Sequence, residues 1–138
     1  MLKGEMVTLC AVEAEDLQQL LDWRNDPDFR KYFREYRELN MRQQETWFNE
    51  KVINDSDTLM FSIRRNCDNE LLGCCGFVYI NWVHQHADLS LYIGWDNAYI
   101  DEEGYATESS KLLLKYGFDE LSLNKIWTEI YEFDNKKQ

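Results

Sequence analysis

Apolar residues recur along this chain with two different periods, and these periods predict an alternation of strands and helices. Apolar runs and alternating positions, rich in β-branched and aromatic residues, predict strands over residues 6–12, 58–65, 71–81, 87–93 and 125–133. Apolar residues three or four positions apart predict helices over residues 14–23, 41–54 and 105–120, with a short helical piece over 27–33. In the first helix Leu17, Leu20 and Leu21 share one face, and in the second Trp47 and Phe48 face the core.

Turn-forming residues fix how some of these elements connect. Asn25-Asp26-Pro27 ends the first helix, because proline disfavours helix in the residue before it. The turn residues 66–69 separate two strands and predict a hairpin. Strand 87–93, helix 105–120 and strand 125–133 form a parallel unit, which is right-handed by default.

Length and composition fit a single domain over residues 1–138. The 138 residues are 44% apolar and 14% aromatic, which is enough for a core, and no repeat, low-complexity segment or linker divides them. The net charge of −11 argues against a nucleic-acid partner, which needs basic patches. It suits a cationic substrate, or simply solubility.

The expected compartment is the cytoplasm. No apolar run approaches the roughly 20 residues of a transmembrane helix, so no membrane partner is expected, and the N-terminus lacks signal-peptide features. The four cysteines agree with this, since none forms a CxxC pair and Cys74 and Cys75 are adjacent in an apolar strand. We therefore expect all four to be reduced.

A glycine loop, DEEGYAT at residues 101–107, lies between strand 87–93 and the helix that follows. Free backbone N–H groups at a helix N-terminus, together with the helix dipole, can hold a phosphate. The loop therefore suggests an anionic cofactor. The alternative is that Gly104 is an ordinary turn residue.

Three segments, INWVHQHADLSLYIG, DEEGYAT and KLLLKYGFDELSLNKIWTEIYEFDN, together resemble the GNAT superfamily of acetyl-CoA-dependent N-acetyltransferases. The chain looks most like the branch that holds the RimJ/RimL ribosomal-protein acetyltransferases and the spermidine acetyltransferases, over essentially its whole length. The resemblance implies an α/β (α+β) fold with a mixed, mostly antiparallel sheet and helices on both faces. It also implies that strands 87–93 and 125–133 splay apart to admit the pantetheine arm of acetyl-CoA.

The resemblance assigns residues to the cosubstrate. In the family the cofactor loop reads Q/R-x-x-G-x-G/A; here Gly104 and Ala106 take the small positions, and Asp101 stands where Gln or Arg is usual. Three carboxylates near a diphosphate weaken binding by roughly a kcal/mol per close pair unless they point to solvent. The cofactor-binding residues implied are Leu91, Tyr92, Ile93, Asp101, Glu102, Glu103, Gly104, Tyr105, Ala106, Thr107 and Asn135. For Leu91 to Ile93 the alternative is that they are ordinary sheet residues.

The implied reaction is direct acetyl transfer from the thioester to a primary amine of a small molecule, an amino sugar or a protein N-terminus. The amine must lose its proton before it attacks. Asp88 matches the acidic residue of the family's AEFQ-like segment, so it is the candidate to bind or deprotonate the amine. The alternatives are a solvated strand carboxylate or an anchor of the turn at residues 84–86. Glu35 and Glu38 are further candidates for binding the amine.

His84, His86 and Asp88 also have the spacing of metal ligands on one strand face. No fourth ligand is evident, so no metal is expected, and a structural role for His84 across the turn is the preferred interpretation.

Family members continue past the equivalent of Asn135 with a helix and two strands, and that helix carries the tyrosine usually cast as general acid. This chain stops at Gln138, either as a truncated form or as a short form completed by another subunit. Strand 125–133, with Trp127, Tyr131 and Phe133, would then be exposed, and we expect a homo-oligomer such as a dimer. The alternative function is a catalytically impaired CoA-binding or dimerisation module.

Overall fold

A computed structural model describes all of residues 1–138 and has one six-stranded sheet. In sequence order the strands are β1 (Leu2–Lys3), β2 (Val7–Ala11), β3 (Leu59–Arg65), β4 (Leu71–Asn81), β5 (His86–Ile93) and β6 (Lys125–Trp127). The α-helices are α1 (Leu17–Asn25), α2 (Pro27–Arg30), α3 (Met41–Trp47) and α4 (Tyr105–Lys115). Shorter helical turns are η1 (Ala14–Asp16), η2 (Phe48–Ile53), η3 (Trp95–Asn97) and η4 (Tyr116–Glu120).

The sheet follows the chain order from β1 to β6, and every neighbouring pair is antiparallel except β5 and β6. The β3–β4 pairing confirms the predicted hairpin. Helix α4 connects the parallel strands β5 and β6, as a crossover connection requires. This mixed, mostly antiparallel sheet is the predicted fold class. The two-residue strand β1 was not predicted, and it extends the sheet by pairing Leu2 with Leu9.

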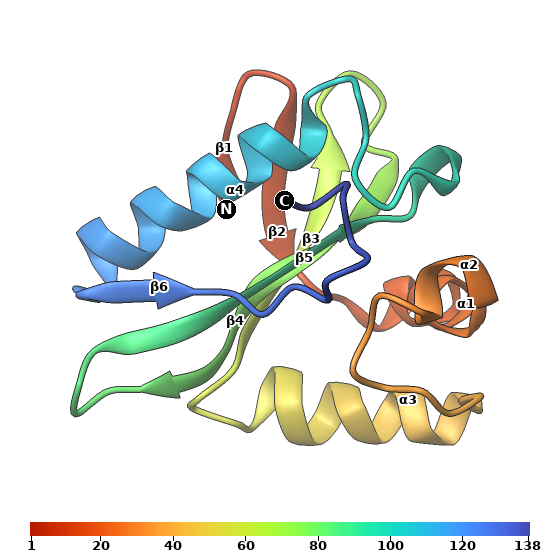
Figure 1. Ribbon diagram of the computed structural model, residues 1–138, viewed down its shortest axis with the longest axis horizontal. Coiled ribbons are helices and arrows are strands. Elements are labelled where there is room, and N and C mark those ends of the chain that lie inside the picture. Colours follow the sequence, from red (N-terminus) through yellow and green to blue (C-terminus); the bar gives the residue numbers. More distant parts are fainter.

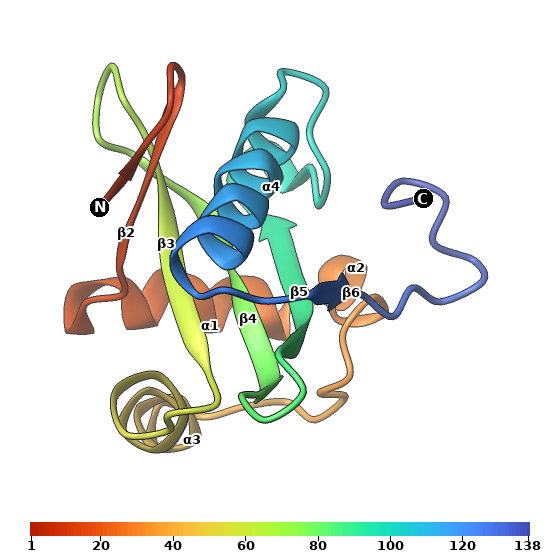
Figure 2. The same cartoon turned by 90° about the vertical axis from the view of Figure 1, so that its left-hand side faces the viewer.

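Helices cover both faces of the sheet, with α4 on one side and α1, α2 and α3 on the other (Figures 1 and 2). Side chains alternate across the strands, so the adjacent residues Cys74 and Cys75 serve different cores. Cys75 packs in the larger core beneath α4 with Leu113, and Cys74 packs in the smaller one with Leu20 and Phe29. All four cysteines are free thiols.

The helix predicted to contain Trp47 and Phe48 has a break in its geometry. Residues 41–54 were expected as one helix, but α3 gives way after Trp47 to the π-helical turn η2. Trp47 and Phe48 are only partly buried. The fully buried side chain is Gln44, which accepts a hydrogen bond of 2.5 Å from Arg24.

No helix of the protein has the length and apolar character needed to cross a membrane.

The last predicted strand is much shorter than expected. Residues 125–133 were expected to be one strand, but β6 ends at Trp127 and residues 128–138 have no regular structure. The cause is that β5 and β6 separate, which leaves the following backbone without a partner strand. The C-terminal segment is held instead by its side chains: the Tyr99 hydroxyl donates to the buried Asp134 carboxylate at 2.5 Å, and Tyr32 packs against Phe133.

Candidate active site

The separation of β5 and β6 creates the most distinctive local geometry of the sheet. The two strands pair only through residues 86–88 and 125–127, and the last pair joins Asp88 to Trp127. One residue further along, the Thr128 hydroxyl donates to the Leu89 carbonyl at 3.0 Å, and beyond this contact the strands diverge. The predicted splay is therefore present, and Asp88 stands at its vertex.

A cleft of about 1470 Å³ opens at this vertex, between the divergent strands and the segment that joins α2 to α3. Its lining brings together four of the residues predicted from the sequence: Glu35, Asp88, Leu91 and Tyr92. It does not include Glu38, Ile93, Asn135 or any residue of the loop 101–107. The expected site for the acceptor amine and the start of the expected pantetheine path thus share one cleft, whereas the expected diphosphate loop lies apart from it.

Asp88 is a buried carboxylate with a cation against it. Its side chain is 2% exposed, so the interpretation of Asp88 as a solvated strand residue is wrong. The Arg34 guanidinium donates to the Asp88 carboxylate and, at 3.1 Å, to Glu129. Arg34 also lies over the Tyr79 ring, with its guanidinium carbon 5.4 Å from the ring centroid. Since the partner of Asp88 is Arg34, the carboxylate does not anchor the turn at residues 84–86 either.

Burial raises the pKa of the Asp88 carboxyl above its usual range, although the hydrogen bond and the charge of Arg34 act in the opposite direction. Burial also lowers the pKa of the Lys137 ammonium, which lines the same cleft, although Asp134 and Asp88 oppose this shift. A raised carboxyl pKa makes Asp88 a better proton acceptor than an ordinary surface aspartate at neutral pH.

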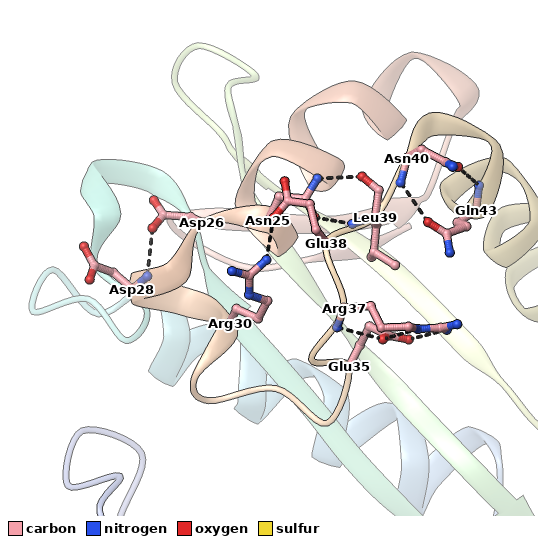
Figure 3. Close-up of polar contacts among 10 residues, drawn as sticks. All are labelled: Asn25, Asp26, Asp28, Arg30, Glu35, Arg37, Glu38, Leu39, Asn40 and Gln43. Carbon is pink, nitrogen blue, oxygen red and sulfur yellow. Dashed lines mark hydrogen bonds and ion pairs between the residues drawn. The ribbon is translucent and has the colours of Figure 1, made fainter.

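Glu35 and Glu38 are both paired with arginines close to them in the sequence (Figure 3). Glu35 accepts from Arg37 at 2.8 and 2.9 Å, and these hydrogen bonds lower its pKa to about 2. Glu38 pairs with Arg30 at 2.5 Å and lies outside the cleft lining. Of the two, only Glu35 faces the cleft, as a carboxylate already held in an ion pair.

The loop 101–107 is closed by one of its own side chains. The Asp101 carboxylate accepts from the backbone N–H groups of Tyr105 and Ala106, the first two residues of α4, at 2.9 and 2.8 Å. Gly104 precedes them with φ +103°, a left-handed conformation that favours glycine. Glu102 and Glu103 are exposed and make no hydrogen bond to these amides.

These observations decide how well the residues fit acetyl-CoA. The gap between β5 and β6, beside Leu91 and Tyr92, fits an extended arm that adds to a strand edge. The start of α4 does not fit a diphosphate as it stands, because Asp101 holds the two amides that an anion would use. The carboxylate of Asp101 and a phosphate compete for the same donors.

His84 and His86 do not form a metal site together with Asp88. Their rings are nearly parallel with centroids 6.3 Å apart, and the Asp88 carboxylate is bound by Arg34. The His84 backbone N–H donates to the Asn81 side chain at 2.9 Å across the turn, a contact that does not depend on the imidazole.

Several residues of the cleft escaped the sequence analysis. Arg34 lies in the segment FREYRELN, where only the acidic residues drew attention, and its partner Asp88 lies 54 residues further along the chain. Tyr79 faces the cleft because β4 has an irregular register between Val78 and Asn81, where Tyr79 has φ +51°. Neither feature leaves a pattern that spacing or composition could reveal.

The comparisons with known proteins agree with this geometry. Residues 7–138 match the acetyltransferase (GNAT) domain family. The spermidine N(1)-acetyltransferase of Escherichia coli is 30% identical over 132 residues, which cover 95% of this chain and 67% of that enzyme. An N-acetyltransferase called p20, of Bacillus licheniformis, is 28% identical over 130 residues, or 91% of this chain and 70% of that protein.

Among solved structures, the spermidine N-acetyltransferase of Vibrio cholerae, in complex with CoA and spermine, superimposes with a TM-score of 0.81. The identity is 24%, and the match covers 92% of this chain and 72% of that chain, so this likeness supports the fold. The chain belongs to the GNAT acetyltransferase family. It is an acetyl-CoA-dependent N-acetyltransferase, as the sequence resemblance implied.

Proposed function

We propose that residues 1–138 act as one catalytic domain that acetylates a primary amine of a small organic cation, with a linear polyamine of the spermidine type as the first candidate. The observation that carries this proposal is the buried carboxylate of Asp88 at the vertex of β5 and β6, already paired with an organic cation of the protein itself. The cleft also contains Asp57, an exposed carboxylate without an ion-pair partner, which favours a substrate with more than one positive charge.

The roles of the residues follow from their places. Bound acetyl-CoA supplies an activated acetyl thioester. Asp88 binds the ammonium group of the acceptor and takes its proton, directly or through a water molecule, which leaves the neutral amine needed for attack. Glu35 lines the cleft and adds negative potential that attracts the cationic acceptor. Glu38 lies outside the lining and attracts the acceptor only through its long-range charge.

For the cosubstrate, backbone groups of Leu91, Tyr92 and Ile93 hold the amides of the pantetheine arm, by the geometry of an added strand. The loop 101–107 receives the diphosphate after the Asp101 carboxylate turns away from α4, and the exposed Glu102 and Glu103 stay in solvent. Asn135, in the segment after β6, completes the cosubstrate site.

The relatives support an amine of this class. The Escherichia coli relative is named as a spermidine acetyltransferase, and the Vibrio cholerae structure contains CoA and spermine. Amino sugars and peptide N-termini remain acceptors to be compared with polyamines in the same screen. Thiol release on mixing with acetyl-CoA and each amine tests the proposal. Turnover with spermidine above that with amino sugars and peptides supports it, and turnover with none of them contradicts it.

A second candidate function is a catalytically impaired CoA-binding or dimerisation module. The observation in its favour is the Asp101 carboxylate on the first amides of α4, which opposes tight binding of a diphosphate. Thermal stabilisation by CoA without turnover on any amine would support this module over the enzyme.

Self-association is part of the proposal. Beyond β6 the side chains of Ile130, Tyr131 and Phe133 are exposed on the segment that follows an edge strand. We expect a homo-oligomer in the cytoplasm. Gel filtration at increasing concentration tests the oligomer, and elution as a monomer at high concentration would contradict it.

A further inference from the structure

Asp88, Glu129 and Tyr79 together form a site for a cation at the vertex of the splayed strands, and the cation in that site belongs to the protein. We propose that Arg34 is a specificity-determining residue whose guanidinium occupies the position of the acceptor's ammonium group, so that an acceptor must displace it. This inference rests on the proposed function and names a residue that controls access to the same site.

The three side chains that form this site, Asp88, Glu129 and Tyr79, each stabilise a positive charge in a different way. Asp88 is 2% exposed, and a buried carboxylate is strongly destabilised unless a cation or a proton compensates it. Glu129 supplies a second carboxylate 3.1 Å from the same guanidinium nitrogen. The Tyr79 ring supplies a cation–π contact with its centroid 5.4 Å from the guanidinium carbon. A cation with several N–H donors is therefore the ligand best suited to replace Arg34 in this site.

The local backbone conformation directs the Tyr79 ring into the cleft. Tyr79 has φ +51°, which is uncommon for a bulky side chain, and it lies where the pairing of β4 with β5 is irregular. Such irregularities redirect a side chain. Here the ring is 64% exposed and lines the cleft under the Arg34 guanidinium instead of packing in the core.

Arg34 can leave the site without unfolding its surroundings. The preceding residues hold the backbone by aromatic contacts: Tyr32 stacks on Tyr99 with centroids 3.9 Å apart, and Phe33 packs on Tyr92. On the other side, Leu39 exchanges backbone hydrogen bonds of 2.7 and 2.8 Å with the Asn25 side chain (Figure 3). The Arg34 side chain is 44% exposed, so rotation into solvent vacates the site while the segment stays in place.

The class of ligand expected here is set by what can take the place of the Arg34 guanidinium. An ammonium group on a flexible alkyl chain can donate to both carboxylates and lie against the tyrosine ring, as Arg34 does. Lys137 lines the same cleft and interacts electrostatically with Asp88, so the protein already places a second cationic side chain close to this carboxylate. A compound with two or more ammonium groups is therefore a better competitor than a monoamine, because it can compensate more than one carboxylate of the cleft.

The test is calorimetric titration of the full chain with spermidine, without acetyl-CoA. In Arg34→Gln the competing charge is gone, and the expected result is about three- to tenfold tighter binding, since a site closed most of the time lowers apparent affinity by its open fraction. Arg42→Gln removes the same charge from the exposed side of α3 outside the cleft and should change affinity less than twofold. Arg34→Lys keeps a positive charge but lacks the planar guanidinium that can donate to two carboxylates, so it should give an intermediate affinity.

Unchanged or weaker spermidine binding in Arg34→Gln, with wild-type melting temperature, overturns the inference. If Arg34→Gln does not fold, the test depends on Arg34→Lys. Wild-type affinity for spermidine in Arg34→Lys also overturns the inference. Failure of every variant to bind spermidine overturns it as well. The thiol-release screen then separates the two proposals: turnover that does not depend on residue 34 leaves the acetyltransferase proposal standing, whereas absence of turnover on any amine contradicts both.

Discussion

The two ends of β5 each lead to an aspartate that holds donors of the protein itself, but the partners differ in what they can do. Asp88, near the start of the strand, holds the half-exposed side chain of Arg34. Asp101, in the loop beyond its end, holds the backbone amides of Tyr105 and Ala106. A side chain can rotate away, whereas the amides are fixed by the helix they begin.

This difference sets how each end can open for a ligand. At the amine end the protein's cation leaves and the carboxylate stays in place for the substrate. At the cosubstrate end the carboxylate itself must leave and the amides stay in place for the anion. The same residue type therefore acts as a ligand-binding group at one end of β5 and as a competitor of the ligand at the other.

The largest expected effect comes from the amine end. Asp88→Asn removes the proton acceptor and the charge that binds the ammonium group, and kcat/KM for spermidine should fall about a hundredfold, as is common when a general base is lost. Thiol release with acetyl-CoA measures it. Asp119→Asn, an exposed site in η4 outside the cleft, is the matched control and should retain nearly full activity. Activity of Asp88→Asn within threefold of wild type would remove Asp88 from the mechanism.

The next effect concerns the turn before α4. Gly104 has φ +103°, and a Cβ there meets the Met6 side chain at 3.1 Å. Gly104→Trp should weaken acetyl-CoA binding more than tenfold, because the backbone is strained and the anion site is obstructed. Gly104→Ala separates the two causes: it carries the backbone strain, of about 1–2 kcal/mol, without the bulk. Calorimetry and melting temperature report binding and strain, and unchanged affinity in Gly104→Trp would show that this loop does not bind the cosubstrate.

A smaller and opposite effect is expected at Asp101. Asp101→Asn keeps the shape but removes the charge that competes with a phosphate, so affinity for CoA should rise about fivefold, which corresponds to about 1 kcal/mol for one close, partly screened charge. The gain should shrink in high salt. Glu103→Gln removes an exposed charge from the same loop and should give a smaller gain. Equal gains in both variants would mean that net charge, not occupation of the α4 amides, limits affinity.

The smallest effect is a pH dependence on the cleft wall. The pKa of Glu35 is lowered to about 2 from 4.5, mainly by hydrogen bonds from Arg37. A lowered folded-state pKa means that this carboxylate stabilises the protein above pH 4.5 and loses that contribution as the pH falls towards 2. Glu35→Gln should therefore lower the melting temperature slightly at pH 7 and not at pH 2. Glu120→Gln, exposed in η4, is the control, and a difference from wild type that persists at pH 2 would contradict the assignment.

How far the sequence could predict these features depends on how local they are. The turn at residues 66–69 and the strand–helix–strand order from β5 to β6 are encoded by neighbours in the chain, and both were predicted. The length of β6 was not, because a strand needs a partner and the loss of that partner depends on the splay. The pairing of Arg34 with Asp88 was not found either, since it joins segments 54 residues apart.

The cosubstrate loop shows a second kind of limit. The sequence revealed that Asp101 replaces a usual Gln or Arg and that acidic side chains weaken binding of a diphosphate. It did not reveal which carboxylate matters, because that depends on side-chain direction. In the structure Glu102 and Glu103 point to solvent, and Asp101 alone binds the first amides of α4.

The division of Cys74 and Cys75 between the two cores has a practical benefit for measuring thiol release. Burial raises the pKa of Cys74 to about 12 and that of Cys75 well above its usual range, so neither sulfur is a ready nucleophile towards a disulfide reagent. When a colorimetric disulfide reagent is used to detect free CoA, the background reaction with the protein should come from Cys67, which is exposed in the hairpin turn. The partly covered Cys10 should react more slowly. A Cys67→Ser background would give the cleanest baseline for comparing the variants.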